Sequence, residues 1–418
     1  MIVGLKAKSK SRYGTARWQY TPGANDIIAA ALNTRIAAGV GEAIVSDLRV
    51  QKFAKILVEH STRVAPGDRI LIEGTTAAEP LLRELYIQVL EHGGIPHPLI
   101  GLPGMVPFMQ DDLYLRHAKE AQLDFVPAFH KLAYDQFEGR IRVHSATNTR
   151  ASNNADPLKA QRRGKGLSSI TEAQMRRSAE GNFKWVTTLY PTDGYAQEAG
   201  MSLSEYEDFV FEAVHTQEAD PIAYWESTAA AQQQAIDFLS SRSQVVLRGP
   251  NVDLTLSIKG RKFENSTGEY NMPDGEIFTG PVEDSVNGWV RFTYPAIYDG
   301  VAVEGAELTF SNGRVESAKA EKNQDYLVKM LETDQGSRYL GEFAIGTNRD
   351  ITRFKGHILF DEKIGGSFHM ALGAGYPETG SRNKSAIHWD MICDLRKDSE
   401  ILADGDLFYK DGQFVFKN

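Results

Sequence analysis

Residues 69–100 contain the pattern that most restricts the fold of this chain. An apolar run over residues 69–74 is followed by an amphipathic segment from Pro80 to Glu91, a glycine pair at 93–94 and a second apolar run from Ile95 to Ile100. Strand, helix, glycine turn and strand in this order predict a βαβ unit with a right-handed crossover. The pattern therefore predicts a parallel sheet covered by helices.

The alternation of predicted strands and helices continues, less regularly, to about residue 242. Arg140–His144 and Lys184–Tyr190 are predicted strands, Ser202 and Glu205 form a capping box before a helix, and residues 221–242 form a long helical segment. We expect residues 47–242 to form an α/β domain with an open, largely parallel sheet.

The sequence pattern changes at residue 243. Short apolar runs at 244–249, 253–258 and 288–292 alternate with turns rich in glycine, proline and asparagine, and one helix is predicted at 325–332. We expect residues 243–418 to form an α+β domain. Residues 1–46 are rich in small and basic residues, and we interpret them as a partly disordered extension with a short helix near residues 26–38.

The composition restricts the possible binding partners of the protein and its location in the cell. The chain has 418 residues and a formal charge of −9, which argues against nucleic acid as a main partner. Its one dense basic run, Arg162 to Lys165, is interpreted as a solvated loop. Cys393 is the single cysteine, so no intrachain disulfide can form, and no apolar run reaches membrane-spanning length. We expect a cytoplasmic protein without membrane partners.

Potential metal ligands gather in the last third of the chain. His388 and Asp390 are two apart in a predicted strand, so both side chains face the same way. Taken alone, that pair is explained better by a half-buried strand with its polar side toward water. His369 follows a glycine pair, and alone it is explained by packing, as is Tyr376.

Three glutamates complete this set. Glu276 follows a Pro-Asp-Gly turn, and Glu342 stands between a glycine and apolar residues, where a carboxylate is costly to bury without a cation. Glu362 could instead pair with Lys363 or lie in solvent. Together, carboxylates and imidazoles of these types predict a centre for a divalent cation such as Zn²⁺, Co²⁺ or Mn²⁺. Motifs of serine hydrolases, P-loop proteins and dinucleotide-binding folds are absent from the sequence.

At these residues the sequence resembles the aminopeptidase T family of dinuclear metallo-aminopeptidases, which includes aminopeptidase S. The resemblance runs from about Val50 to the C-terminus and is carried by the segments Asn271–Glu276, Leu340–Glu342, Phe360–Glu362 and His388–Asp390. It implies removal of N-terminal residues from short peptides by water activated between two divalent metal ions. It also implies a homodimer.

The resemblance further implies roles for individual residues. The implied metal ligands are Glu276, Glu342, His369, His388 and Asp390, with Glu342 as the bridge. The implied catalytic residues are Glu342 or Glu362 as the proton-transferring carboxylate, with Tyr376 lining the site. Two alternatives stay open: a dimetal hydrolase of another amide or ester, and a non-catalytic α/β binding protein with a vestigial site.

Overall fold

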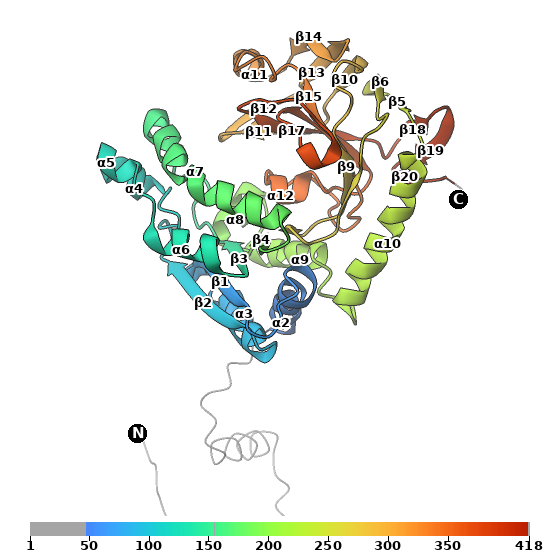
Figure 1. Ribbon diagram of the computed structural model, residues 1–418. Helices are drawn as coiled ribbons and strands as arrows, with labels where there is room; N and C mark the ends of the chain where they lie inside the picture. Colours follow the sequence, from blue (N-terminus) through green and yellow to red (C-terminus); the bar gives the residue numbers. More distant parts are fainter. Residues whose placement is uncertain (1–46, 154, 417–418) are drawn as a thin grey trace, which may run out of the picture. The chain divides into compact units, whose positions relative to one another are not determined.

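The computed structural model describes residues 47–153 and 155–416, which belong to one compact unit (Figure 1). The predicted extension at residues 1–46, with its short helix, lies outside the described residues. The division at residue 243 stays a prediction.

Helices begin at polar residues that cap their free N–H groups. The side chain of Asp47 accepts a hydrogen bond from the backbone of Arg49, Ser202 and Glu205 form a reciprocal capping box, and Asp220 caps a helix whose first residue is Pro221. The α-helices are α2 (Leu48–Lys55), α3 (Glu79–Glu91), α4 (Asp112–His117), α5 (Glu120–Leu123), α6 (Ala128–Gln136), α7 (Pro157–Ala179), α8 (Asp193–Glu198), α9 (Leu203–Ala213), α10 (Pro221–Ser240), α11 (Gln324–Leu331) and α12 (Ile358–Asp361). A π-helical segment, η1 (Ile56–Ser61), continues α2, and η2 (Thr76–Ala78) and η3 (Pro377–Thr379) are 3₁₀ turns. Among the described residues, none of these helices combines the length and apolar character needed to cross a membrane.

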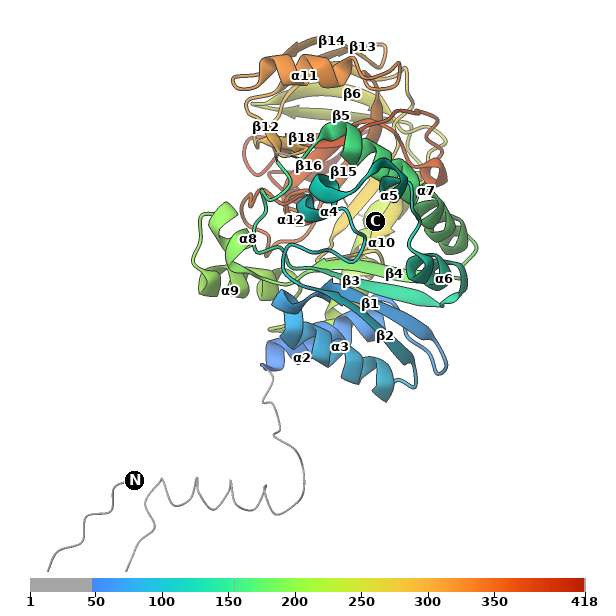
Figure 2. The ribbon, with the colours of Figure 1, turned by 90° about the vertical axis from the view of Figure 1, so that its left-hand side faces the viewer.

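The first sheet is parallel and has the strand order β2-β1-β3-β4-β8. Its strands are β1 (Arg69–Thr75), β2 (Ile95–Gly101), β3 (Gly139–His144), β4 (Lys184–Leu189) and β8 (Asn271–Met272). Ile70 and Ile72 pack with α2 and α3 on one face, whereas Leu71 packs with α6 and α7 on the other. The predicted α/β fold with its βαβ unit is therefore confirmed (Figure 2).

The later part of the chain forms antiparallel sheets, as expected of an α+β region. One sheet has the order β14-β13-β10-β6-β5-β18-β19-β20, a second has the order β17-β16-β15-β9-β7, and β11 and β12 form a hairpin. The strands are β5 (Gln244–Gly249), β6 (Val252–Ser257), β7 (Glu264–Ser266), β9 (Glu276–Thr279), β10 (Asn287–Arg291), β11 (Ala296–Tyr298), β12 (Val301–Val303), β13 (Glu307–Ser311), β14 (Arg314–Lys319), β15 (Leu340–Gly346), β16 (Ser367–Gly373), β17 (His388–Asp394), β18 (Glu400–Ala403), β19 (Asp406–Lys410) and β20 (Gln413–Phe414).

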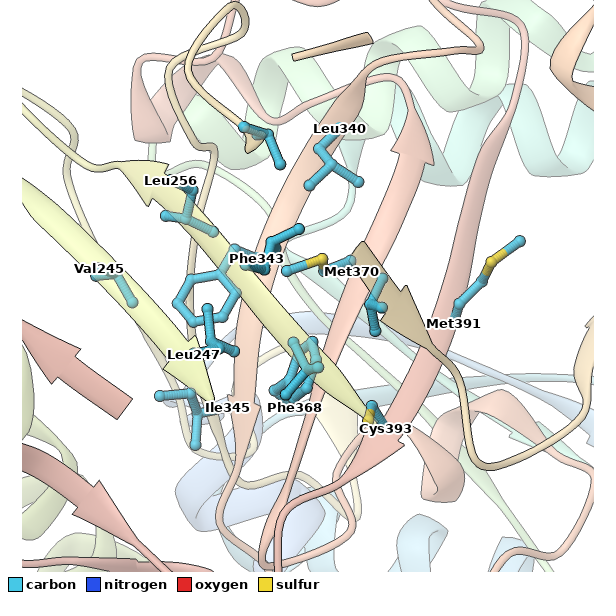
Figure 3. Close-up of a cluster of buried hydrophobic side chains, with 14 of the residues drawn as sticks. Val245, Leu247, Leu256, Leu340, Phe343, Ile345, Phe368, Met370, Met391 and Cys393 are labelled. Atoms are coloured by element: carbon cyan, nitrogen blue, oxygen red, sulfur yellow. The ribbon is translucent and has the colours of Figure 1, made fainter. Parts of the chain in front are cut away.

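A hydrophobic core fills the space between the two antiparallel sheets (Figure 3). Leu247 and Leu256 come from one sheet, and Phe343, Met370 and Cys393 come from the other. Cys393 is fully buried in this core, and burial raises the pKa of its thiol to about 12. Because strand side chains alternate, every second residue of β16 and β17 points away from this core.

One short segment connects the parallel sheet to the antiparallel one. β8 pairs with β4 through Asn271 and Met272, and the chain then passes directly into β9, which pairs with β15. Glu276 is the first residue of β9. The end of the parallel sheet therefore leads straight to one of the predicted ligands.

The basic run at Arg162 to Lys165 lies within helix α7, so its interpretation as a solvated loop was wrong. Arg163 is fully buried, and its guanidinium donates to four backbone carbonyl oxygens, of Phe108, Met109, Leu123 and Phe125. A guanidinium that donates four of its five N–H groups to carbonyl oxygens can be buried without a carboxylate partner.

Candidate metal centre

The predicted ligands lie on one face of the second antiparallel sheet, opposite the hydrophobic core. In β17, Trp389 and Met391 face the core, so His388 and Asp390 point the other way. In β16, Phe368 and Met370 face the core, and the residue between them, His369, shares the polar face. The sheet therefore brings together residues from β9, β15, β16 and β17.

A bulge in β15 turns Glu342 toward this face. Leu340 and Glu342 are two apart, yet Leu340 lies in the core, because the register with β16 shifts between them. Gly341 is the extra residue. A Cβ at this position would lie 2.1 Å from the carbonyl oxygen of Ala374, so only glycine allows the bulge.

Both histidines are oriented by backbone carbonyl groups. Nδ1 of His369 lies 3.0 Å from the carbonyl oxygen of Glu362, and Nδ1 of His388 lies 2.7 Å from that of Ala374. Because a carbonyl oxygen can only accept, each Nδ1 carries the proton and each Nε2 points to the carboxylates. This outer hydrogen bond is typical of histidines that bind metals.

The ligand atoms converge on two overlapping positions. Nε2 of His369 lies 3.4 Å from Glu342 and 3.5 Å from Glu276, and Nε2 of His388 lies 3.3 Å from Glu342 and 3.5 Å from Asp390. Within the group Glu276, Glu342 and His369, and within the group Glu342, His388 and Asp390, one ligand atom from each residue lies within 4.8 Å of the others. Glu342 belongs to both groups.

The chemistry of the set fits divalent cations. Oε2 of Glu276 and Oδ1 of Asp390 are buried and accept no hydrogen bond. A buried carboxylate oxygen without a donor is costly unless a cation neutralises it. Carboxylate oxygens and imidazole nitrogens are the ligands of zinc and related metals.

The pKa values of the glutamate and the two histidines reflect the close approach of carboxylates and imidazoles in this site. Burial alone would raise the pKa of Glu342, but hydrogen bonds and charge from His369 and His388 outweigh it and hold that pKa below its usual range. Burial would lower the pKa of His388, but Asp390 and Glu342 raise it to about 12; Glu342 and Glu276 similarly raise the pKa of His369 to about 9. A metal ion has to displace these protons in order to bind.

Lys363 is a functional residue that the sequence analysis missed. Its ammonium is fully buried and lies 2.5 Å from Glu276, 2.8 Å from Glu362 and 3.5 Å from Asp274. These carboxylates raise the pKa of Lys363 well above its usual range, against the effect of burial. A lysine next to the apolar Ile364 and within a cluster of acidic residues was the available signal.

Glu362 and Tyr376 border the ligand cluster from two sides. Glu362 follows helix α12, and its carboxylate can join His369 and Asp390 in a third group of ligand atoms within 4.8 Å. The alternative pairing with Lys363 is also present in the structure. The Tyr376 ring lies 5.2 Å from that of His388 and is 39% exposed. All seven predicted residues are therefore neighbours in one region.

Converging carboxylates and imidazoles, with both histidines oriented by backbone carbonyl groups on one face of an antiparallel sheet, are the kind of centre that metal-dependent hydrolases use. The chain belongs to the thermophilic metalloprotease family (M29), whose profile matches residues 46–414. Divalent metal use follows from this membership.

Several characterised proteins are similar over most of their length. Aminopeptidase AmpS of Bacillus subtilis (strain 168) is 26% identical over 88% of this chain and 98% of its own. Aminopeptidase T of Thermus thermophilus is 27% identical over 87% of this chain and 95% of its own. The solved structure of wild-type AmpT from Thermus thermophilus has a TM-score of 0.76 at 23% identity, covering 88% of this chain and 99% of that one, and shows the same fold.

Proposed function

We propose that this metalloprotease is an aminopeptidase that releases N-terminal amino acids from short peptides with two divalent metal ions, Zn²⁺, Co²⁺ or Mn²⁺. Glu276, Glu342 and His369 would hold one ion, and Glu342, His388 and Asp390 would hold the other. The observation that carries the proposal is the sharing of Glu342 between two groups of converging ligand atoms. The aminopeptidase names of the relatives support the same activity.

When bound, the ions would lower the pKa of a water molecule and polarise the scissile carbonyl group. The chain supplies the proton transfer. Glu362 is the better candidate for this role, because Glu342 is committed to both ligand groups. Its carboxylate would take the proton from the water and deliver it to the leaving amine.

The surrounding residues keep this carboxylate in place. Lys363 donates to Glu362, and the backbone carbonyl of Glu362 accepts from His369. Both the side chain and the backbone of Glu362 are thus hydrogen-bonded to residues of the site. Tyr376, beside His388 and partly exposed, would contact the substrate at the rim of the site.

Metal removal and reconstitution test the proposal. The purified chain is stripped with a chelator, loaded separately with Zn²⁺, Co²⁺ or Mn²⁺, and assayed on leucine anilide, N-acetyl-leucine anilide and a phosphoester. We expect two ions per chain by elemental analysis and cleavage of the free-amine anilide alone. Cleavage of the acetylated anilide at a similar rate would indicate another amide hydrolase, and inactivity with all three metals would indicate a vestigial site.

The proposal includes a homodimer, as the family resemblance implies, and a cytoplasmic location, as expected from the composition of the sequence. Light scattering of the purified chain checks the first part, because a dimer has twice the 46.4 kDa mass of the chain. Cell fractionation checks the second.

A further inference from the structure

The sheet face that carries the metal ligands also carries an aromatic side chain. Glu276 and Phe278 are two apart in β9, and Ile277 between them packs into the hydrophobic core. Since side chains alternate along a strand, Phe278 shares the face of Glu276, and the two residues lie about 7 Å apart along the strand. Phe278 is half-buried, so part of its surface stays accessible beside a proposed metal ligand.

Tyr376 continues this aromatic surface toward the second group of ligand atoms. Its ring lies 5.4 Å from that of Phe278 and 5.2 Å from that of His388. Burial raises the pKa of the Tyr376 phenol, and the charges of Glu342 and Asp390 raise it further, so the phenol lies close to those carboxylates. The rings of Phe278 and Tyr376 therefore border both proposed metal positions.

The loop that carries Tyr376 is held in place. The carbonyl oxygen of Tyr376 accepts a hydrogen bond from the hydroxyl of Thr379 at 2.7 Å. The same loop orients His388, whose Nδ1 lies 2.7 Å from the carbonyl oxygen of Ala374. A ring on such a loop has a set position relative to the ligands, which is what selection among substrates requires.

The proposed reaction brings one particular side chain of the peptide to this region. The side chain of the first residue is attached to the carbon next to the scissile carbonyl group, and that carbonyl group is bound at the metal ions. The side chain therefore has to lie against a wall of the metal centre. The wall formed by Lys363 is polar and fully buried, whereas the wall formed by Phe278 and Tyr376 is aromatic and partly exposed.

We propose that Phe278, together with Tyr376, binds the side chain of the residue that is released and thereby determines which N-terminal residues are accepted. The inference rests on the aminopeptidase function proposed above and adds a specificity-determining residue to it. An apolar side chain would cover apolar surface of the two rings and remove it from water, which stabilises the complex. A charged side chain would lose water against the same surface, which is unfavourable.

The experiment compares the anilides of glycine, alanine, leucine, phenylalanine and glutamate on the metal-loaded enzyme. We expect a kcat/KM for leucine anilide that is about 10-fold or more above that for alanine anilide, and a lower value for glutamate anilide than for leucine anilide. In Phe278→Ala the leucine-to-alanine ratio should fall by about 5-fold or more. Cleavage of glycine anilide and the metal content should change little.

Phe278→Leu is the conservative variant, because it keeps an apolar side chain but removes the ring. It should retain most of the preference for leucine over alanine. Its phenylalanine-to-leucine ratio should fall by about 2- to 10-fold, the size of a contact between two rings. Phe129→Ala is the matched control, since it removes a partly exposed phenylalanine from α6, and its ratios should equal those of the wild type.

Elemental analysis and thermal unfolding of each variant check that metal and fold are retained. An unchanged leucine-to-alanine ratio in Phe278→Ala overturns the inference, and so does a uniform loss on all five anilides, which would indicate a structural role. If Phe278→Ala does not fold, an unchanged phenylalanine-to-leucine ratio in Phe278→Leu overturns it. Equal cleavage of all five anilides by the wild type does the same. Inactivity of the wild type on every free-amine substrate overturns the aminopeptidase proposal instead.

Discussion

Lys363 and Glu276 form a buried ion pair in which only one carboxylate oxygen is used. Oε1 of Glu276 lies 2.5 Å from the ammonium, whereas Oε2 has no hydrogen-bond donor and faces His369 at 3.5 Å. The lysine therefore fixes the direction of the free oxygen. It also offsets the charge of Glu362, so a single cation supports two carboxylates of the site.

Replacing Lys363 by Met should reduce both metal affinity and stability. Loss of a partner that orients a ligand typically lowers metal affinity by about 10- to 100-fold, and leaving buried carboxylates unpaired costs about 3 to 5 kcal/mol. Metal titration and urea unfolding of the metal-free chain measure the two effects. Lys410→Met, at an exposed position, is the control. Unchanged metal affinity in Lys363→Met would show that Glu276 is oriented without the lysine.

Glu342→Gln and Glu362→Gln should fail in different ways. Because Glu342 belongs to both ligand groups, the Glu342→Gln variant should bind less than the full number of metal ions and show no measurable turnover. Glu362→Gln should keep its metal but lose about 100- to 10,000-fold in kcat, the usual contribution of a proton-transferring group. Elemental analysis and anilide assays on the same samples separate these outcomes. Full metal content in Glu342→Gln would contradict its role as a bridge.

Glu73 should make stability depend on acid pH. This carboxylate is buried beside Arg142 and His130, and although burial raises its pKa, Arg142 and then His130 lower it to about 2 from 4.5. Since the folded pKa is depressed, the stabilisation is complete above about pH 4.5 and is lost as the pH falls toward 2. Its size is on the order of 3 kcal/mol.

Urea unfolding between pH 6 and pH 3 checks this dependence. Glu73→Gln should unfold at lower urea concentration at pH 6 and show a flatter loss of stability with acid than the wild type. Glu226→Gln, exposed on α10, should behave like the wild type. Parallel curves for all three chains would mean that Glu73 carries no such stabilisation.

Arg163→Met should destabilise the chain by about 3 kcal/mol, because it leaves several buried carbonyl oxygens without donors. Its neighbour Arg162 is the natural control, since it pairs with Asp124 at the surface, where ion pairs contribute little. Arg162→Met should therefore change thermal unfolding much less. Equal effects of the two substitutions would contradict the role given to the buried guanidinium.

The strands could be predicted because they follow from local patterns, whereas the proposed ligand set came from the family resemblance. Alternation in β17 separated His388 and Asp390 from Trp389 and Met391, and the structure keeps that separation. The orientation of Glu342 depends on a bulge, which the pattern Leu-Gly-Glu permits but does not require. Simple alternation would place Leu340 and Glu342 on the same face.

The errors concern residues whose environment comes from distant segments. Arg163 appears in sequence as one charge among several, and its acceptors lie about forty to fifty-five positions earlier. Gly166 makes the same helix look weak, yet a Cβ there would lie 2.5 Å from the carbonyl oxygen of Leu123. The contact of Lys363 with Glu276 was missed for the same reason, because Glu276 is 87 positions away.

The two-residue strand β8 has a consequence for any attempt to divide the protein. Cutting the gene near codon 243 would leave β4 without its neighbouring strand β8, which Asn271 and Met272 form. The start of β9, which follows β8 in the chain, would then no longer be held next to the parallel sheet. Fragments produced in this way should be insoluble or inactive when expressed separately. Recovery of activity would require both pieces to be synthesised together, so that the parallel sheet regains its last strand.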